Sequence, residues 1–246
     1  MLLLIDAGNT RVKWALAKDA AEAGDWVAHG AVSHAELTQL STHWQGASIT
    51  HALLSNVAGA DIAAQLEATL AHIGLTRDSI RWFRSQAVCA GVVNGYRDPT
   101  QLGCDRFATL IGARHRFPSQ ALLVVTAGTA TTVDAMDASG RFIGGMILPG
   151  LGTMARSLAL NTAQLPAVDE ATFEHLFADN TRDAIISGCV HAQVGAITHA
   201  HAQLPDARCV LSGGAATYIA PHLALPTERI DHLVLLGLHV ALLSEK

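Results

Sequence analysis

The sequence predicts an α/β fold in which one architecture occurs twice, as two similar lobes. Half of the 246 residues are hydrophobic and only 15% are charged, so the chain can bury a sizeable core. The segments LLLIDAGNT (residues 2–10) and LLVVTAGTA (residues 122–130) share a pattern and begin about half a chain length apart. In each half the hydrophobic pattern gives three strands, then a helix and a further strand. We therefore expect a first lobe at residues 1–114 and a second lobe at residues 115–246.

The elements of the first lobe follow from alternating hydrophobic residues and from turn and cap residues. A glycine-containing turn joins the first two strands, and Ser33 stands where a helix cap would. The expected strands are residues 2–6, 12–17, 26–32, 49–55 and 80–83, and the expected helices are residues 35–43, 60–73 and 101–117.

The second lobe repeats this opening. Two strands surround Gly128, and the hairpin signal DASG leads into a third strand. The expected strands are residues 121–126, 131–136, 141–147 and 209–212, and the expected helices are residues 153–160, 181–204 and about 231 to the end.

Charge and cysteine content exclude several classes of protein. The formal net charge is −5 and no block of Lys or Arg occurs, which disfavours direct binding to nucleic acid. The four cysteines are far apart and form no C-x-x-C pair, as expected of reduced thiols in a cytosolic protein.

The apolar run at the N-terminus stops at Asp6, too early for a signal peptide, and the C-terminal run is too short to span a bilayer. We expect a cytoplasmic protein without membrane contact, and the low charge content favours a homo-oligomer.

The first candidate motif is Asp6-Ala7-Gly8-Asn9-Thr10, followed by Arg11-Val12-Lys13. A strand enters and a strand leaves, so the motif is a hairpin and not a strand–helix phosphate loop. Gly8 lets the backbone approach a ligand, and backbone N–H groups with Lys13 can bind phosphate oxygens. Asp6 at the strand end could hold Mg²⁺ through water. An ordinary tight hairpin explains this motif equally well when it is taken alone.

The second candidate motif is the hairpin from Thr126 to Thr132, which contains Gly128 and Thr129. Four hydroxyl side chains follow a buried strand, although threonine also suits strands. Two opposed hairpins of this kind could clamp a triphosphate between the lobes. The pair is more specific than either hairpin alone.

The third candidate motif, Gly103-Cys104-Asp105-Arg106, lies near the start of a predicted helix. A carboxylate beside a guanidinium is expected to stay ionised and could accept a proton from a substrate hydroxyl. Arg106 could bind a substrate carboxylate in a bidentate way. An ordinary helix N-terminus with a surface arginine is the alternative, and it is the commoner arrangement.

Together, in this order and spacing, D-x-G-N-T with Lys13, G-x-D-R and G-T-A-T-T-x-D resemble the type III pantothenate kinases, over essentially the whole chain. The resemblance implies a duplicated actin-like ATPase (ribonuclease H-like) fold with a nucleotide cleft between two lobes. It also implies transfer of phosphate from ATP to the primary hydroxyl of pantothenate, the first step towards coenzyme A. Members of this family are typically homodimers that use Mg²⁺ and a monovalent cation, K⁺ or NH₄⁺.

The resemblance also implies roles for individual residues. Asp105 would be the catalytic base, and the ATP phosphates would be bound by residues 6–13 with Gly128 and Thr129. Pantothenate would be bound by a second set of residues: Tyr96, Gly103, Cys104, Asp105, Arg106 and Thr181.

This chain departs from the family pattern in three places. Thr126 stands where the family usually has the aspartate that binds the monovalent cation, so that site is in doubt. Ser55-Asn56-Val57 replaces Ser-Ser-Val, and Ser212-Gly213-Gly214-Ala215 replaces Thr-Gly-Gly-Asp, which leaves nucleotide preference open. Two alternatives therefore remain: a nucleotide-binding regulator that transfers no phosphate, and a kinase or phosphatase for another small substrate.

The 13 histidines show no metal-ligand pattern. His199 and His201, for example, are two residues apart on a predicted helix and face different directions. Surface or helix-face positions are the expected role of the histidines.

Overall fold

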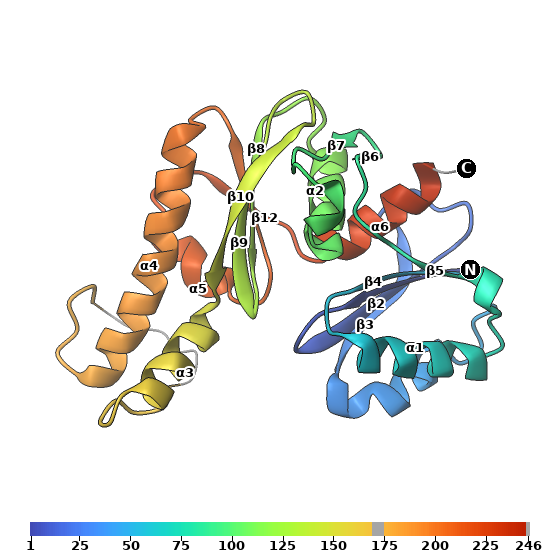
Figure 1. Ribbon diagram of the computed structural model, residues 1–246, viewed down its shortest axis with the longest axis horizontal. Coiled ribbons are helices and arrows are strands. Elements are labelled where there is room, and N and C mark those ends of the chain that lie inside the picture. The colour runs from blue at the N-terminus through green and yellow to red at the C-terminus, as the bar shows by residue number, and fades with distance from the viewer. Residues whose placement is uncertain (169–174, 245–246) are drawn as a thin grey trace. The chain divides into compact units, whose positions relative to one another are not determined.

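The computed structural model describes residues 1–168 and 175–244, and they form two compact units (Figure 1). Unit 1 comprises residues 1–117 and 233–246, and unit 2 comprises residues 118–232. Each unit contains one five-stranded mixed sheet with the same connectivity, so the duplication predicted from the two matching segments is confirmed.

The sheet of unit 1 has the order β3-β2-β1-β4-β5. Strands β1, β2 and β3 form an antiparallel meander, and β4 and β5 continue parallel to β1. The five strands are β1 (Leu2–Ala7), β2 (Arg11–Ala17), β3 (Trp26–Ser33), β4 (His51–Asn56) and β5 (Ile80–Trp82). All six residues of β1 are buried, because this central strand is covered on both faces.

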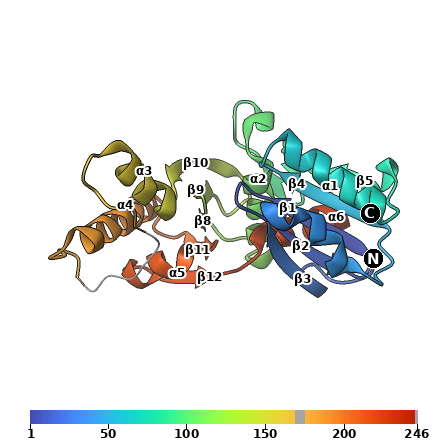
Figure 2. The ribbon, with the colours of Figure 1, turned by 90° about the horizontal axis from the view of Figure 1, so that it is seen from below.

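Helices cover both faces of this sheet, as Figures 1 and 2 show. The 3₁₀ helix η1 (His34–Trp44) and helix α1 (Ala60–His72) pack their leucines on one face. Helices α2 (Cys104–Arg116) and α6 (Leu233–Ser244) lie on the other. Between β5 and α2, unit 1 also contains short elements: η2 (Arg77–Ser79), the hairpin β6 (Val88–Cys89) and β7 (Val92–Val93), and η3 (Pro99–Gln101).

The sheet of unit 2 has the order β10-β9-β8-β11-β12, with the same strand directions as in unit 1. The strands are β8 (Leu122–Ala127), β9 (Ala130–Met136), β10 (Phe142–Pro149), β11 (Arg208–Ser212) and β12 (Thr227–Arg229). One face of this sheet packs on the helices of the unit, namely α3 (Leu151–Asn161), α4 (Thr181–Gln203) and α5 (Ala216–Ile219), which is followed by η4 (Ala220–His222).

Most predicted elements are found within a few residues of their expected ends. The helix predicted at residues 35–43 is a 3₁₀ helix, and the helix predicted from residue 101 begins at Cys104 because Pro99 starts a separate 3₁₀ turn. The short strand β12 was not predicted, since three residues give no readable alternation. Residues 245–246, predicted to continue the last helix, lie outside the described residues.

The assignment of α6 differs from the predicted lobes. The sequence division after residue 114 placed this helix in the second lobe, whereas it packs against α2 in unit 1. Two glycines permit the close approach. A Cβ on Gly237 would lie 1.7 Å from the carbonyl oxygen of Ala108, and one on Gly112 would lie 2.5 Å from that of Leu233. The helix is apolar on all sides, so burial against α2 and the first sheet stabilises it.

We predict that Gly237→Ala destabilises the protein by at least about 2 kcal/mol, because an added methyl group forces α2 and α6 apart. Urea denaturation measures the change. Gly195→Ala on α4 is the control, since its Cβ would meet nothing within 4 Å. That change should stabilise α4 by up to about 1 kcal/mol, because position 195 is exposed. Equal effects of the two substitutions would contradict this account of the α2–α6 contact.

Candidate active site

The first candidate motif forms the turn between β1 and β2. Asp6 on β1 lies opposite Lys13 on β2, and the Gly8 N–H donates to the Arg11 carbonyl oxygen over 3.1 Å. Asn9 and Thr10 at the tip are exposed. The strand–turn–strand arrangement predicted for residues 6–13 is therefore present, with its tip open to a ligand.

Asp6 is a buried carboxylic acid, with 6% of its surface exposed. Burial raises its pKa from 3.8 to about 6; the positive charge of Lys13 lowers the pKa, and the nearby charge of Asp105 raises it further. The fold thus holds an acid that is costly to ionise beside the glycine turn between β1 and β2. A cation bound there would relieve that cost, which fits the proposed magnesium ligand.

Asp105 is the second residue of α2, and Gly103 is the helix N-cap. Its Oδ1 accepts a hydrogen bond of 2.8 Å from the Arg106 N–H. A Cβ on residue 103 would lie 2.7 Å from the same oxygen, so glycine at this position makes room for the carboxylate. The site therefore depends on Gly103 as well as on the acid.

The electrostatics of Asp105 correct the sequence-based expectation. Arg106 was expected to keep the carboxylate readily ionised, and it does lower the pKa. Burial has the larger effect, so the pKa of Asp105 is raised above its ordinary value. A raised pKa makes the carboxylate a stronger proton acceptor once it is ionised.

Cys104 connects this helix to the sheet. Its Sγ lies 3.3 Å from Oγ of Ser55 and 3.6 Å from the carbonyl oxygen of Asn56, at the carboxyl end of β4. In the sequence, Ser55-Asn56 stood out only as a departure from a family pattern. Its contact with α2 spans almost 50 residues and has no local signal.

Arg106 and Tyr96 form a pair in unit 1. The guanidinium donates to the Tyr96 hydroxyl over 3.0 Å and lies 5.7 Å from the ring centroid. The loop that carries Tyr96 is held by Asn94, which accepts from the Tyr96 N–H and donates to the Pro99 carbonyl oxygen. Arg106 is 7% exposed, so it presents a largely desolvated positive charge. The structure thus brings together three residues predicted to bind substrate: Tyr96, Asp105 and Arg106.

The second candidate motif is the turn between β8 and β9 in unit 2. The Gly128 N–H donates to the Ala130 carbonyl oxygen over 3.0 Å, so this turn closes one residue sooner than the first turn, where the Gly8 N–H donates to the Arg11 carbonyl oxygen. The carbonyl oxygen of Thr129 accepts from the Gly150 N–H over 3.0 Å and from the Thr153 hydroxyl over 2.8 Å. The turn is therefore supported by the segment that follows β10.

Glycine is required twice around this turn. A Cβ on Gly150 would lie 2.0 Å from the Gly128 carbonyl oxygen. A Cβ on Gly213, which has a φ of +94°, would lie 2.2 Å from the Ala127 carbonyl oxygen. Backbone segments can approach the turn only because these side chains are missing.

The threonines of this hairpin do not all face one site. Thr126 lies opposite Thr132, and these cross-strand partners share a face of the sheet. Thr131 is fully buried and lies with Val133 on the other face, because neighbouring residues of a strand point in opposite directions. The predicted cluster of four hydroxyl groups is thus divided between the two faces.

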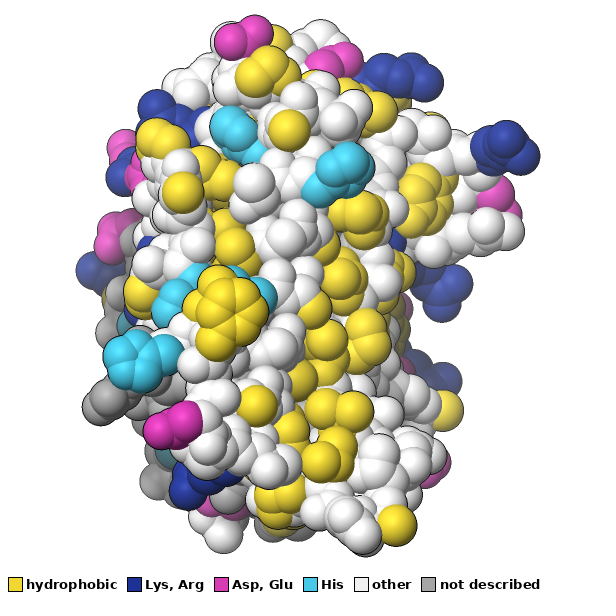
Figure 3. Space-filling model, turned by 90° about the vertical axis from the view of Figure 1, so that its left-hand side faces the viewer, with side chains coloured by type: hydrophobic (Ala, Val, Ile, Leu, Met, Phe, Trp, Pro, Cys, Tyr) yellow, Lys and Arg dark blue, Asp and Glu magenta, His cyan; other side chains and the backbone are white. Residues whose placement is uncertain are grey.

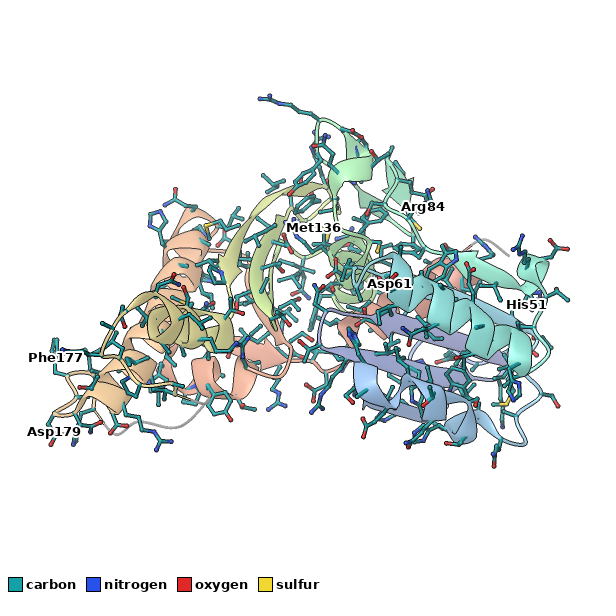
Figure 4. The ribbon with its side chains drawn as sticks, turned by 60° about the horizontal axis from the view of Figure 1, so that its bottom comes forward. His51, Asp61, Arg84, Met136, Phe177 and Asp179 are labelled. Carbon is teal, nitrogen blue, oxygen red and sulfur yellow. The ribbon has the colours of Figure 1, made fainter. Side chains whose placement is uncertain are left out.

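Thr181 is the first residue of α4, directly after the N-cap Asn180, whose side chain accepts from the Asp183 N–H. Phe177 and Asp179, labelled in Figure 4, lie in the segment just before it. Thr181 belongs to unit 2, and its part in substrate binding stays a prediction.

The four cysteines are free thiols. Within residues 1–168 and 175–244, no three His, Cys, Asp or Glu side chains are grouped so that they could hold a metal ion. Over the same residues, no helix has the length and hydropathy required to cross a membrane.

Residues 2–203 match the family model of type III pantothenate kinase. The type III pantothenate kinase of Janthinobacterium sp. (strain Marseille) is 53% identical, covering 97% of this chain and 96% of the relative. That of Herminiimonas arsenicoxydans is 50% identical with the same coverage.

Two solved structures are similar in fold. A Campylobacter jejuni protein described as a Baf family transcriptional activator has a TM-score of 0.62 at 18% identity, covering 99% of this chain and 98% of its own. The activator of the 2-hydroxyisocaproyl-CoA dehydratase from Clostridium difficile, solved with bound ADPNP, has a TM-score of 0.52 at 13% identity, covering 99% and 93%. The predicted actin-like fold is confirmed by such likenesses.

We predict that Asp6→Asn stabilises the protein at neutral pH. A folded-state pKa of about 6 against an unfolded value of 3.8 costs about 3 kcal/mol of stability above pH 6, and this cost disappears as the pH falls towards 4. Urea denaturation without Mg²⁺, at pH 7.5 and pH 4.5, measures the gain at each pH.

Asp25→Asn, at an exposed position of the same unit, is the control and should change the stability little at either pH. An Asp6→Asn protein that is no more stable than the wild type at pH 7.5 would contradict the description of Asp6 as a strained acid.

Proposed function

The chain belongs to the type III pantothenate kinase family, and on that basis we propose how its residues transfer phosphate from ATP to the primary hydroxyl of pantothenate. The observation that carries the residue assignments is the group formed in unit 1 by the buried acid Asp6, the partly buried acid Asp105 and the desolvated Arg106. It combines a proton acceptor, a cation ligand and an anion-binding group beside a glycine turn suited to phosphate.

Asp105 is the proposed general base. Its carboxylate takes the proton of the pantothenate hydroxyl while that oxygen forms a bond to the γ-phosphorus and the bond from the γ-phosphorus to the β-phosphate oxygen breaks. The products are 4′-phosphopantothenate and ADP. Burial of Asp105 supports this role, because its raised pKa brings the acid closer to the operating pH.

Arg106 and Tyr96 are proposed to bind the carboxylate of pantothenate. A buried guanidinium gains from an anionic partner, and its planar donors match a carboxylate in two places. Tyr96 orients Arg106 through the 3.0 Å hydrogen bond. Gly103 and Cys104 would line the same site through the backbone at the start of α2, and Thr181 would contribute from α4.

The two glycine turns are proposed to bind the phosphates of ATP. In the first turn these are residues 6–13: Asp6, Ala7, Gly8, Asn9, Thr10, Arg11, Val12 and Lys13. In the second they are Gly128 and Thr129. Exposed N–H groups at each tip can donate to phosphate oxygens, and Lys13 supplies positive charge. Asp6 would hold Mg²⁺, which neutralises phosphate charge when it is bound.

Unit 2 carries apolar side chains on its surface, and we propose that the protein is a homodimer, as the resemblance implied. Figure 3 shows hydrophobic side chains in a broken band on the face it presents. The exposed large hydrophobic residues of unit 2 include Ile143, Met146, Ile147, Leu158 and Leu160. Their exposure is unusual for a soluble monomer and typical of an interface. Cytoplasmic location and no direct binding to nucleic acid complete the proposal.

We predict that Asp105→Asn lowers turnover of pantothenate roughly a hundredfold or more, because the amide cannot accept the proton. The measurement is pantothenate-dependent release of ADP at saturating ATP. Asp61→Asn is a matched control, since Asp61 is the second residue of α1 as Asp105 is of α2 (Figure 4). Full activity of Asp105→Asn would remove this residue from the role of base.

A second prediction concerns the monovalent cation. Thr126 offers a neutral oxygen where the family pattern has a carboxylate, so K⁺ or NH₄⁺ should bind weakly here. Replacing Na⁺ by K⁺ should therefore raise the turnover of Thr126→Asp more than that of the wild type. A wild-type enzyme that requires K⁺ as strictly as the variant would show that the cation is bound without this carboxylate.

A further inference from the structure

A histidine far from the first glycine turn in sequence makes a hydrogen bond to it. Nε2 of His34 lies 2.9 Å from the carbonyl oxygen of Gly8. A carbonyl oxygen can only accept, so Nε2 carries the hydrogen in this contact. His34 is half-buried and is the first residue of η1.

The position of His34 is fixed on both sides. Ser33 before it pairs with Arg11 in the sheet. Glu36 after it accepts hydrogen bonds from the Ser33 N–H over 2.9 Å and from the Ser33 hydroxyl over 2.7 Å, and the first of these is the carboxylate half of a capping box. The imidazole therefore reaches Gly8 from a rigid support.

Holding the Gly8 carbonyl determines where the next N–H points. In a trans peptide group the C=O and the following N–H point in opposite directions. When the Gly8 oxygen is directed to His34, the Asn9 N–H is directed away from His34. The Gly8 N–H is itself held by the Arg11 carbonyl oxygen, so the turn has little freedom to rotate.

Unit 2 contains an equivalent support. There, Gly150 N–H and the Thr153 hydroxyl donate to the Thr129 carbonyl oxygen at the turn. Both donors follow β10, the third strand of that unit, as His34 follows β3, the third strand of unit 1. In each copy of the duplicated fold, the segment after the third strand thus holds a carbonyl of the glycine turn. In unit 1 the donor is the His34 side chain, so the contact can be removed by mutation.

We propose that His34 is a positioning residue for ATP: it fixes the Gly8–Asn9 peptide so that the Asn9 N–H is preorganised to donate to a phosphate oxygen. His34 itself does not contact the nucleotide. The inference rests on the proposed role of the first turn in phosphate binding. Preorganised donors bind phosphate better because no ordering cost remains at binding.

The test compares three substitutions. In His34→Gln, the side-chain amide nitrogen is as many bonds from Cβ as Nε2 is, so the donor is kept. His34→Asn places its nitrogen too close to the backbone, and His34→Leu has no donor. We expect His34→Asn and His34→Leu to raise the dissociation constant and the KM for ATP about three- to tenfold. Both constants should stay near the wild-type values in His34→Gln. The kcat and the KM for pantothenate should change little in all three.

Calorimetric titration of each protein with ATP and Mg²⁺, followed by steady-state kinetics, gives these values. His72→Leu, at an exposed position at the end of α1, is the control for loss of a histidine. Wild-type affinity for ATP in both His34→Asn and His34→Leu would overturn the inference, and so would an equal loss of affinity in His34→Gln and His34→Leu. Equal changes in the KM for ATP and the KM for pantothenate would overturn it as well. An enzyme that binds ATP but does not phosphorylate pantothenate would overturn the proposed function only, since the His34 comparison measures nucleotide binding.

Discussion

The desolvation of two carboxylates in unit 1 is the constraint on which the proposed site depends. Asp6 lies next to the last residue of the central strand of the first sheet, and Asp105 lies in the first turn of the helix that covers the sheet, so folding desolvates both acids. Burial raises the pKa of each, and the charge of Asp105 raises that of Asp6 further. This cost in stability favours function when a cation bound at Asp6 and a substrate proton taken up by Asp105 relieve it.

Glycines around the proposed site leave space for these acids and for the elements that carry them. Gly103 leaves space for the Asp105 carboxylate, and Gly112 with Gly237 lets α6 support the helix that carries it. In unit 2, Gly150 and Gly213 let neighbouring loops reach the second turn. These glycines thus leave the space that neighbouring groups of the proposed site need. Substitution of such a glycine should disturb function by displacing those groups.

Because the fold is duplicated, equivalent positions of the two units can be compared, and they differ at one residue of the proposed site. Both units have the same strand order and a glycine at the start of the turn after the central strand. At the residue before the last of that strand, unit 1 has the ionisable Asp6 and unit 2 has the neutral Thr126. This difference is consistent with the proposal that the divalent cation binds in unit 1, and with a proposed contribution of unit 2 that consists mainly of backbone N–H groups.

The sequence predicted the fold, and it pointed to most residues of the candidate site, because the signals of both are local. Hydrophobic alternation and the repeated strand-Ala-Gly pattern gave the two sheets, and the ordered motifs gave Asp6, Asp105 and Arg106. Long-range effects were missed. The place of α6 depends on glycine contacts across more than 100 residues, and the raised pKa of Asp105 depends on burial that a neighbouring arginine does not reveal. His34 was dismissed with the other histidines because its contact with Gly8 spans 26 residues.

The central claim is that this chain phosphorylates pantothenate through a carboxylate-binding Arg106 and a proton-accepting Asp105. The most direct measurement is phosphorus NMR of ATP, Mg²⁺ and protein with pantothenate, and with the analogue whose carboxylate is replaced by a primary alcohol. We predict a new phosphomonoester signal and an equal amount of ADP with pantothenate, and much slower formation with the analogue at the same concentration. A folded protein that binds ATP and forms no phosphomonoester with pantothenate would contradict the account and favour a regulator or a kinase for another substrate.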